Sequence, residues 1–434
     1  MSRRITVGAA LALALLMVAA SIPLTMLYAQ SQQNKLIPNL PALIEKFNAL
    51  DEIRRKVDEN FFDRVAEDAV NAEMVRGYIA GLDDPASRYL NAEEYQSYTQ
   101  RLRGEAPELG IVLHYDPDVV GLLIEHVKEG STAAVSGLKI GDQIVKAESG
   151  GKVLFNMPEV APDKATEAID EFYAATAVTA ETSSISITIT YKRDGSYRPP
   201  VNVMLGSAVS SLSKKLIDAW AKEGETPQKI VGYIKIFHFF RNTADQLETA
   251  IKDLSMQGAV AYVLDLRGCS EGTLEYACRA ADLLAHVSKD YDAMATVFYK
   301  DGSTKPRPST ANSMISYAPN GMAVLIDRRT AGVAELFAYD LRAYNPGKVY
   351  LVGEPTRGIN TVQEAFPLAS VGGAALLTVG TVVPYGGDAQ WNSGGVKPNE
   401  PTKIETAQGF IFRLSGAEQQ LNAAVSILTK TAEE

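Results

Sequence analysis

The residues that most resemble a reactive site lie in a turn between a strand and a helix, in the segment LIDRRTAGVAELFAYDL at residues 325–341. The apolar run at 324–326 predicts a buried strand, and helical spacing of apolar residues begins near Ala334. A sharp strand-to-helix turn is a common way to present a nucleophile to solvent. The residue at the crest is Gly332, which has no side chain. The segment therefore predicts the backbone of a nucleophile site without the nucleophile.

Four other residues have side chains that can act in catalysis, and each also has an ordinary structural explanation. Thr330 lies just before the crest of the turn and is expected to be a turn or capping residue. Lys348 precedes a predicted strand and is expected at a solvated edge. His126 and His238 fall within strand patterns and are expected to be structural histidines. A displaced but working site would need groups such as these.

The sequence predicts neither a metal site nor a nucleic-acid surface. Cys269 and Cys278 are the two cysteines, and neither has metal-ligand spacing with any of the four histidines. They are expected to be reduced or incidental, with a local disulfide as the alternative. The formal net charge of -10, without a basic stripe, argues against a phosphate-binding surface. We therefore expect no cofactor, no metal and no nucleic-acid partner.

The N-terminus, residues 1–29, has the features of a signal peptide or a membrane anchor. Arg3 and Arg4 precede an uncharged apolar run at 5–27, which predicts export of the rest of the chain. Ala29 is a candidate cleavage point, whereas about 23 apolar residues are also enough to span a bilayer as an uncleaved anchor. A buried core helix is a third alternative, which the apolar character of every face disfavours. We expect a periplasmic location or one on the outer face of the cytoplasmic membrane.

Three larger regions follow, each with its own periodicity. Residues 37–103 are predicted to be a helical region, because one apolar stripe has helical spacing. That stripe contains Leu43, Phe47, Leu50, Ile53 and Val57. Residues 104–205 alternate apolar and polar residues, which predicts a compact β-rich module of PDZ type. Near 152–184 the alternation stops, and an acidic, Ala-rich helical insert is expected at the surface. Residues 206–434 repeat a strand, helix, strand pattern, which predicts parallel crossover units and an α/β domain.

Several of these segments resemble the carboxyl-terminal processing, or tail-specific, serine proteases over nearly the whole chain after the signal. The similar segments are GLDDPASRYL, STAAVSGLKIGDQI, GYIKIFHFFRNTADQLETAIKDLSMQGAVAYVLDLRG, VGEPTRGINTVQEAFPL and GGVKPNEP. The resemblance implies an α/β multidomain fold with an N-terminal helical region, a PDZ-like domain and a protease-like core. It also implies a serine nucleophile with a lysine general base, without histidine, and a PDZ domain that receives substrate carboxyl termini and gates access.

The resemblance can be carried over residue by residue at the catalytic motifs. The nucleophile motif Thr-Ala-Ser-Ala-Ser-Glu of the family corresponds to residues 330–335, so the nucleophile position is Gly332. The lysine of the Thr-Phe-Gly-Lys-Gly motif corresponds to Ile359, and Gln363 matches the supporting glutamine of the family. Glu335, at the end of the first motif, fixes this register. Glycine has no hydroxyl to attack a carbonyl and isoleucine cannot accept a proton, so the resemblance implies a degenerate protease.

The oxyanion motif of the family, Asn-Pro-Gly-Gly, corresponds to the sequence CSEG at 269–272. One glycine is retained as Gly272, and the other is replaced by Glu271. A carboxylate at this place is expected to oppose the negative charge of a tetrahedral intermediate. This third change therefore agrees with the loss of the nucleophile and of the base.

The resemblance also locates a peptide-binding edge, because the carboxylate-binding loop Gly-Ile-Gly-Ile of the family corresponds to residues 108–111. Backbone amides in this loop are expected to form an anion site. Glu108, at its lip, either repels a peptide carboxylate or points to solvent, and both alternatives stay open. The loop continues with Leu109, Gly110 and Ile111. The apolar groove for an extended chain is expected to involve Leu109, Ile111, Leu113 and Leu138.

Three functions are compatible with these features. The favoured one is an exported pseudoprotease that binds peptides or protein partners, because no serine and lysine pair occupies the matching positions. The alternatives are an active serine endopeptidase acting on protein C-termini with relocated catalytic groups, and a purely structural envelope protein without a groove. The expected partners of the favoured function are extended peptides or protein C-termini, other envelope proteins or an active homologue, and the membrane through the N-terminal segment.

Overall fold

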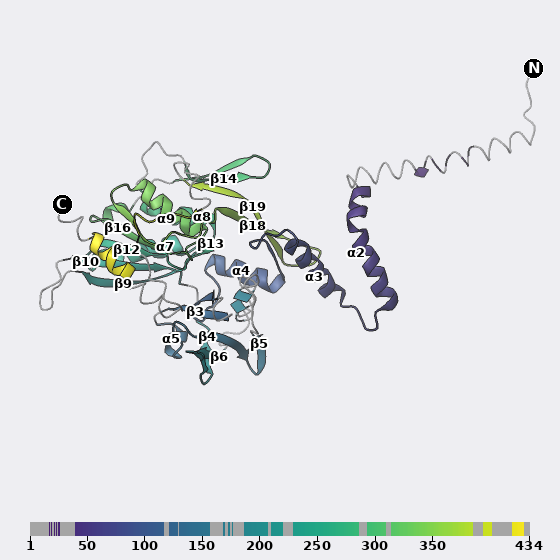
Figure 1. Ribbon diagram of the computed structural model, residues 1–434, viewed down its shortest axis with the longest axis horizontal. Coiled ribbons are helices and arrows are strands. Elements are labelled where there is room, and N and C mark those ends of the chain that lie inside the picture. The colour runs from purple at the N-terminus through teal and green to yellow at the C-terminus, as the bar shows by residue number, and fades with distance from the viewer. Residues whose placement is uncertain are drawn as a thin grey trace, which may run out of the picture. The chain divides into compact units, whose positions relative to one another are not determined.

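The computed structural model describes most of the chain after residue 39. The described segments are 40–116, 121–128, 130–156, 186–206, 210–219, 229–285, 293–309, 314–384, 394–401 and 419–428, with isolated positions between 17 and 26 and between 168 and 176. The chain divides into two compact units, Met1–Val70 and Asn71–Glu434 (Figure 1). Each unit is described by itself below.

The first unit contains a long helix, α2 (Leu40–Asn60). Most of the predicted signal or anchor at 5–27 lies outside the described residues. Within the part of the chain that is described, no helix is both long and apolar enough to cross a membrane. Phe47, Leu50 and Ile53 of α2 are exposed, and the hydrophobic clusters of the described residues include none of the three.

The predicted helical region at 37–103 is not one unit, because the boundary between the two units falls after Val70. Its later elements are α3 (Glu67–Ala80), β1 (Arg88–Leu90) and α4 (Ala92–Arg103). Ile79 of α3 and Tyr89 of β1 pack against Ala375 on a sheet of the second unit. The later part of this region therefore covers a sheet instead of forming a separate helical domain.

Helix α4 begins where the sequence indicates. The Asn91 side chain accepts hydrogen bonds from the backbone amides of Glu93 and Glu94, and the Glu94 carboxylate accepts one from the Asn91 amide. This reciprocal cap satisfies donors that the first turn of a helix otherwise leaves open. An asparagine followed three residues later by a glutamate is a sequence signature of such a cap.

A seven-stranded antiparallel sheet follows, which we call the N-terminal sheet module. Its strands are β2 (Ile111–Asp116), β3 (Gly121–Val127), β4 (Gln143–Ser149), β5 (Lys152–Asn156), β6 (Ser186–Arg193), β7 (Ser196–Tyr197) and β8 (Val201–Met204), with the short helix α5 (Thr132–Val135). The strand order is β2-β3-β4-β6-β7, with β5 beside β4 and β8 beside β6. Strand β2 therefore lies at one edge of the sheet, with β3 as its partner among the described strands.

The segment predicted as a surface insert contributes to the core of this module. Its first residues form β5, which pairs with β4. Phe172 is fully buried, and its ring meets that of Phe155 edge to face with the centroids 5.3 Å apart. The prediction of a surface elaboration is wrong for these residues, because two aromatic rings from the segment fill the interior. The remainder of 157–185 lies largely outside the described residues.

The second half of the chain is built on a six-stranded sheet. In the order of the sheet its strands are β20 (Glu400–Pro401), β17 (Val349–Gly353), β16 (Met322–Ile326), β12 (Ala259–Asp265), β10 (Lys229–Ile236) and β9 (Leu212–Ala219). Strands β10, β12, β16, β17 and β20 run parallel, and β9 is antiparallel to β10. The helices between them are α7 (Thr243–Met256), α8 (Leu274–Leu284) and α9 (Val333–Tyr344). The predicted α/β class with parallel crossover units is confirmed.

Both faces of the parallel sheet are buried, which explains the nearly continuous apolar sequence of its strands. On one face Tyr262 and Leu264 of β12 pack in the cluster that includes residues of α7, α8 and α9. On the other face Val263 packs with Ala424 and Leu428 from the helical residues 419–428. The side chains of the central strands β12 and β16 alternate between these two clusters.

Three smaller groups of elements complete the fold. The antiparallel strands β14 (Ala293–Tyr299), β15 (Thr304–Pro308), β18 (Thr361–Pro367) and β19 (Ala374–Pro384) form a second sheet with β1. The strands β11 (His238–Phe239) and β13 (Glu271–Gly272) form a short parallel pair. A single turn of 3-10 helix, η2 (Ile315–Tyr317), precedes β16.

Candidate functional site

The turn at Gly332 lies at the carboxyl end of a central parallel strand, where ligands bind in open α/β sheets. Strand β16 ends at Ile326, and α9 begins at Val333. Gly332 has φ 59° and ψ -119°, a conformation that favours glycine. A Cβ added at Gly332 would meet nothing within 4 Å. The crest of the turn thus faces open space and offers no reactive atom to it.

One buried carboxylate joins this turn to the loop that carries the predicted base position. Glu335, in the first turn of α9, is 0% exposed. One of its oxygens accepts hydrogen bonds from the amides of Gly332 and Ile359, at 2.7 and 2.8 Å. Its other oxygen accepts from the Gly358 amide at 2.6 Å and from the Thr356 hydroxyl. The backbone at positions 332 and 359 therefore lies around the same carboxyl group.

Sequence reasoning used Glu335 only to fix the register and missed this structural role. The available signal is an acidic residue in the first turn of a helix, where the backbone amides favour negative charge. That signal does not indicate that a second loop donates two further amide hydrogen bonds to the Glu335 carboxylate. The partners of Glu335 lie more than twenty residues further along the chain, which local patterns cannot reveal.

The residue at the base position has no proton-accepting group and is not tightly packed. Ile359 is half-buried and belongs to none of the hydrophobic clusters formed by the described residues. Gln363, on β18, donates from Nε2 to the carbonyl oxygen of Ala86 at 2.9 Å. The retained glutamine thus holds the segment GLDDPASRYL against the second sheet.

The segment predicted to correspond to the oxyanion motif contains a conformationally restricted glycine and a glutamate. Gly272 has φ 143°, and a Cβ there would lie 2.5 Å from the carbonyl oxygen of Phe239, so only glycine fits. The side chain of Glu271 is 39% exposed, and its Oε1 lies 3.2 Å from Nη2 of Arg101 on α4. The charge that the sequence predicts at this place is therefore present, and it is partly compensated by a guanidinium.

Two of the alternative candidates, Thr330 and Lys348, are not placed for catalysis. Thr330 is 0% exposed, and its hydroxyl donates to the carbonyl oxygen of Leu266 at 3.0 Å and accepts from the Asp327 amide at 3.0 Å. These contacts fit the predicted role of a turn residue. Lys348 is exposed just before β17. Neither side chain offers a nucleophile and a base together.

The two histidines that fall in strand patterns pack against aromatic rings. The ring of His126 lies 4.5 Å from that of Phe237, and His238 stacks on Phe240 at 4.0 Å. Burial lowers the pKa of His126 to about 4 and holds the pKa of His238 well below its usual value. Both rings are therefore neutral near neutral pH, in agreement with a structural role.

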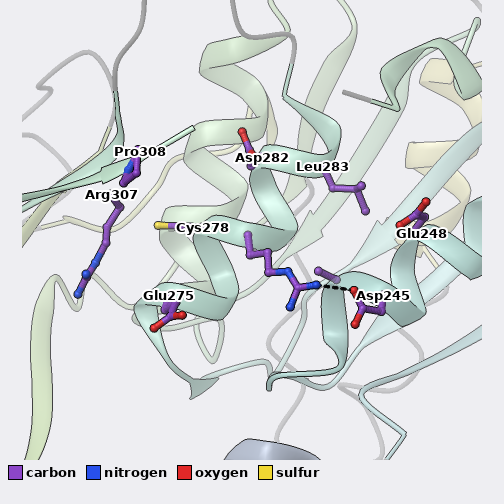
Figure 2. A pocket seen from close by; sticks show the side chains of 10 residues that line it. Asp245, Glu248, Glu275, Cys278, Asp282, Leu283, Arg307 and Pro308 are labelled. Carbon is purple, nitrogen blue, oxygen red and sulfur yellow. Dashed lines mark hydrogen bonds and ion pairs between the residues drawn. The ribbon is translucent and has the colours of Figure 1, made fainter. Parts of the chain in front are cut away.

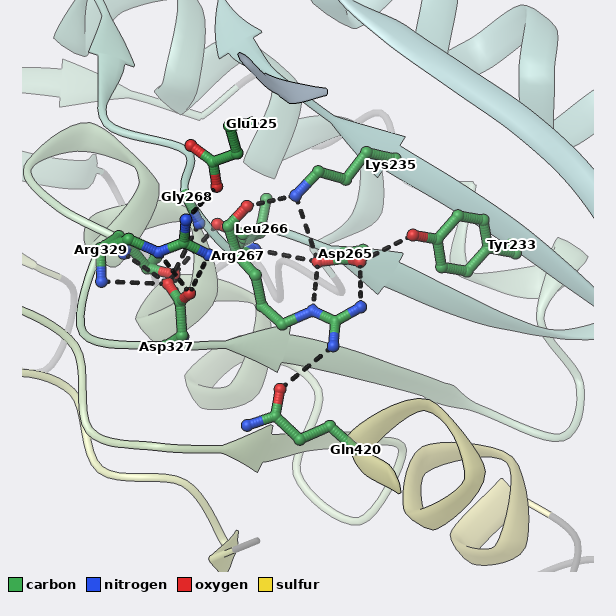
Figure 3. A network of polar contacts seen from close by, with 11 residues as sticks. Glu125, Tyr233, Lys235, Asp265, Leu266, Arg267, Gly268, Asp327, Arg329 and Gln420 are labelled. Carbon is green, nitrogen blue, oxygen red and sulfur yellow. Dashed lines mark hydrogen bonds and ion pairs between the residues drawn. The ribbon is translucent and has the colours of Figure 1, made fainter. Parts of the chain in front are cut away.

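A buried polar network lies at the carboxyl ends of the parallel strands (Figure 3). The Asp265 carboxylate accepts hydrogen bonds from the Tyr233 hydroxyl at 2.7 Å and from Nη2 of Arg267 at 2.6 Å. Burial alone would raise the pKa of Asp265, but the charges of Arg267 and Lys235 hold it well below its usual range. Asp265 is therefore ionised, and Lys235 is committed to this network, because its amine donates to Asp265 and to the carbonyl oxygen of Arg267.

The same network connects the N-terminal sheet module to the candidate site. Oε1 of Glu125, on β3, lies 2.6 Å from Nη1 of Arg329, in the turn that leads to Gly332 (Figure 3). A Cβ added at Gly268, in the loop that leads to the oxyanion region, would lie 1.9 Å from the same oxygen. Asp327 joins the two loops by accepting from the Gly268 amide at 3.0 Å. Glu125 thus contacts both loops of the site at once.

The predicted peptide-binding side chains are buried in the N-terminal sheet module. Leu109, Ile111, Leu113 and Leu138 are 4%, 4%, 7% and 3% exposed and belong to its core. Gly110 has φ 81° and leaves no room for a Cβ beside Ser131. An extended peptide would therefore meet the backbone edge of β2 and not a row of exposed leucines.

Glu108 follows neither of the two alternatives left open by the sequence. Its Oε2 lies 2.6 Å from Nζ of Lys128, and its Oε1 accepts from the Ser210 amide at 3.2 Å. Its side chain is only 20% exposed. The carboxylate is thus neither directed into solvent nor free to repel a peptide, because Lys128 neutralises it.

A hollow separate from these positions lies between α7, α8 and β15 (Figure 2). At its rim Asp245 and Arg279 form an ion pair of 2.6 Å. Cys278 lies in its wall, and burial raises the pKa of this thiol as it does that of Cys269. Both cysteines are free thiols, so the alternative of a local disulfide is wrong. Within the described residues, no group of His, Cys, Asp and Glu could hold a metal ion.

Comparison with known proteins gives consistent similarities. Residues 230–402 match the model of Peptidase family S41. The chain is 26% identical over 360 residues to the carboxy-terminal processing protease CtpA of Bacillus subtilis. The aligned segment covers 83% of this chain and 69% of the relative. It is 27% identical over 358 residues to a carboxyl-terminal-processing protease of Picosynechococcus. That alignment covers 82% of this chain and 79% of the relative.

A solved structure supports the fold. The photosystem II D1 C-terminal processing protease aligns with a TM-score of 0.51 at 21% identity, over 85% of this chain and 89% of the solved one. At this level of identity the similarity concerns the arrangement of the elements. What this chain does must follow from its own residues.

Proposed function

We propose that this chain, which matches the model of Peptidase family S41 over residues 230–402 and is similar to carboxyl-terminal processing proteases, binds extended peptides or protein C-termini without cleaving them. The observation that carries this proposal is the pair of residues held around Glu335, Gly332 and Ile359. One has no hydroxyl and the other has no basic atom. Loss of the nucleophile alone typically removes on the order of 10⁶ in turnover.

The alternative, an active endopeptidase with relocated groups, finds less support in the same contacts. A relocated nucleophile needs an accessible hydroxyl next to a base. Thr330 is enclosed in its turn, and Lys235 is bound to Asp265 and to a backbone carbonyl. These contacts leave neither group available for acyl transfer.

We place the peptide on the edge of β2 in the N-terminal sheet module, which we take to be a PDZ-like domain at 104–205. An edge strand can accept an extended chain through main-chain hydrogen bonds. The loop before β2 contains Gly110 in a left-handed conformation, which suits a backbone anion site. Lys128 adds a positive charge beside this loop, at present shared with Glu108. A terminal carboxylate is the ligand that such a loop favours.

We also propose that the chain is exported and remains at the membrane surface or in the periplasm. The support is Arg3, Arg4 and the uncharged run at 5–27, most of which lies outside the described residues. Fractionation of the native host tests this proposal. Full-length protein in the soluble cytoplasm would contradict it, whereas a fragment beginning near Gln30 would identify a cleaved signal.

Fluorescence anisotropy with two otherwise identical peptides tests the binding function. One peptide ends in a free carboxylate and the other in an amide. The wild-type chain should bind with micromolar affinity, as expected for a small strand-addition site. Glu108→Gly removes the carboxylate that occupies Lys128 and should tighten binding of the free carboxylate about tenfold, with the amide unchanged.

The matched control is Glu105→Gly, which removes an exposed glutamate from the same approach to β2. It should leave the affinity for both peptides unchanged. If neither peptide binds to the wild type or to Glu108→Gly, the proposed function is wrong. If Glu108→Gly increases the affinity for both peptides equally, the proposed carboxylate site is wrong. Binding by strand addition alone would then explain the affinity.

A further inference from the structure

Two histidines lie where β3 of the N-terminal sheet module contacts the α/β domain. His126, on β3, is half-buried, and its ring centroid lies 4.5 Å from that of Phe237, between β10 and β11. His238 follows Phe237 directly and is 7% exposed, and its ring stacks on that of Phe240 at 4.0 Å. The centroids of Phe237 and His238 are 6.2 Å apart. This contact is therefore lined by aromatic rings, two of which can take up a proton.

The cations around these two rings disfavour an added positive charge. Lys128, which follows β3, is 6% exposed, and its charge acts on both imidazoles. Lys235 also faces His126, and Arg101 also faces His238. A protonated imidazole would thus join like charges in a place with little water, where repulsion is weakly screened.

The carboxylates near the two rings are already paired with cations. Asp265 is the acidic residue that faces His126. The ion pairs at this contact are Asp265 with Arg267 at 2.6 Å, Glu108 with Lys128 at 2.6 Å and Glu271 with Arg101 at 3.2 Å. Nε2 of His238 is buried and has no hydrogen-bond partner among the described residues. An imidazolium here would therefore have to compete with an arginine or a lysine for its counter-ion.

We propose that acid opens the contact between β3 and residues 237–240, because protonated His126 and His238 are better accommodated in water than between these rings. The module and the α/β domain each keep their own fold in the open state. Burial lowers the pKa of His126 to about 4, against 6.5 when unperturbed, and holds the pKa of His238 well below its usual value. Below pH 6.5 the open state therefore binds more protons, and opening becomes more favourable as the pH falls toward 4.

Glu125, on the same strand, acts in the opposite direction. Its carboxyl group faces the cations Arg329 and Lys235 and the acids Asp327 and Asp265, and burial raises its pKa (Figure 3). Proton uptake by Glu125 therefore favours the closed contact. Two imidazoles oppose this one carboxyl group, so we expect net opening in acid. Without the imidazoles, Glu125 alone should leave the contact unchanged or more closed at low pH.

Amide hydrogen exchange of the full chain at about pH 7 and about pH 5, corrected for the intrinsic exchange rate, tests this proposal. In the wild type, residues 122–128 and 236–241 should open about tenfold more at the lower pH. Strands β4 and β12, inside the module and the domain, should keep their protection. The double variant His126→Phe with His238→Phe keeps aromatic rings at both positions and should abolish the increase.

The matched control is His114→Phe, which removes a half-buried histidine from β2 of the same module and should respond to acid as the wild type does. If the double variant is unfolded at neutral pH, His126→Phe alone replaces it and should show a smaller increase than the wild type.

Wild-type exchange that does not change with pH would overturn the proposal. So would an increase that persists in the double variant, or in His126→Phe where that variant replaces it, and an increase that disappears in His114→Phe. Simultaneous loss of protection in β4 and β12 would mean global unfolding in place of opening, and would also overturn it. The proposed peptide binding is measured at neutral pH, where the contact is closed, so the two results are separate.

Discussion

At the residue scale, the Glu335 carboxylate holds together the two loops that carry Gly332 and Ile359. It is fully buried, and all four of its hydrogen bonds come from these loops. A buried charge without such donors would be costly, so the four bonds explain how the carboxylate is tolerated. The shape of this part of the structure thus depends on Glu335 and not on the side chains at positions 332 and 359.

Replacement of this residue should therefore affect stability. In Glu335→Gln one acceptor oxygen becomes an NH2 group that faces donors, which leaves buried amides unsatisfied. We expect a loss of about 2–4 kcal/mol in the free energy of unfolding, measured in urea. Glu275→Gln, an exposed residue in the first turn of α8, is the control and should cost less than about 0.5 kcal/mol. Equal stability of the two variants would contradict the role of Glu335.

A serine at position 332 tests whether only the side chain is missing. Gly332→Ser has space for its hydroxyl but strains the backbone at φ 59°, which should cost about 1–3 kcal/mol. Gly332→Ala should cost the same, which isolates the backbone effect. Peptide hydrolysis should stay at background for Gly332→Ser, because position 359 supplies no base.

The triple variant Gly332→Ser, Ile359→Lys and Glu271→Gly restores the family pattern at three positions. We expect at most weak hydrolysis, because a displacement of about 1 Å between the two groups costs roughly 100-fold. Full activity of the single variant Gly332→Ser would show that another residue acts as the base. That result would contradict the assignment of position 359.

At the element scale, β3 is the strand that connects the N-terminal sheet module to the site. Glu125→Gln keeps the size of the side chain but removes the charge that faces Arg329. We expect amide hydrogen exchange at 267–272 and 327–332 to become about tenfold faster, because the loops lose a partly buried ion pair. Glu148→Gln, on β4 of the same sheet and paired with Lys146, is the control. Exchange that stays unchanged in both variants would exclude β3 as the connection.

The neighbouring residue of β3 should make stability depend on pH. His126 has a pKa of about 4 in the folded chain because of burial and of Lys235 nearby, against 6.5 when unperturbed. Between these values the unfolded chain binds more protons, so stability is full above pH 6.5 and falls as the pH decreases toward 4. We expect a loss of about 3 kcal/mol from this residue over that range. His126→Phe should reduce the dependence of the free energy of unfolding on pH between 4 and 6.5. A slope equal to that of the wild type would contradict the role of His126. His238, whose pKa is also lowered, contributes to the slope in the same direction.

Much of the arrangement of elements could be predicted from periodicity. The turn between β16 and α9, the parallel strands and the cap at Asn91 follow from local patterns, which the structure confirms. The burial of Phe172 and the ion pair between Glu108 and Lys128 could not be predicted, because they depend on which distant segments meet. Glu335 was visible as an acidic helix start, but its partners in the next loop were not.

At the scale of the whole molecule, the fold explains how the site keeps its shape with Gly332 and Ile359 at the two predicted catalytic positions. The parallel sheet is buried on both faces, so its stability comes from packing far from the turn. The network of Asp265, Arg267 and Asp327 is likewise complete without a nucleophile. Substitutions at 332, 359 and 271 leave these contacts in place.

The most direct test of this account uses the full-length wild-type chain in two measurements. In the first, mass spectrometry follows the cleavage of an added peptide. In the second, mass spectrometry measures the mass of the protein after exposure to a serine-reactive fluorophosphonate. We expect intact peptide at background level and no covalent adduct, because no described side chain combines an accessible hydroxyl with a base in the site. Cleavage that disappears in Thr330→Val or Lys348→Ala would contradict the account, because it would locate a working catalytic centre where the structure has an enclosed turn residue or a solvated lysine.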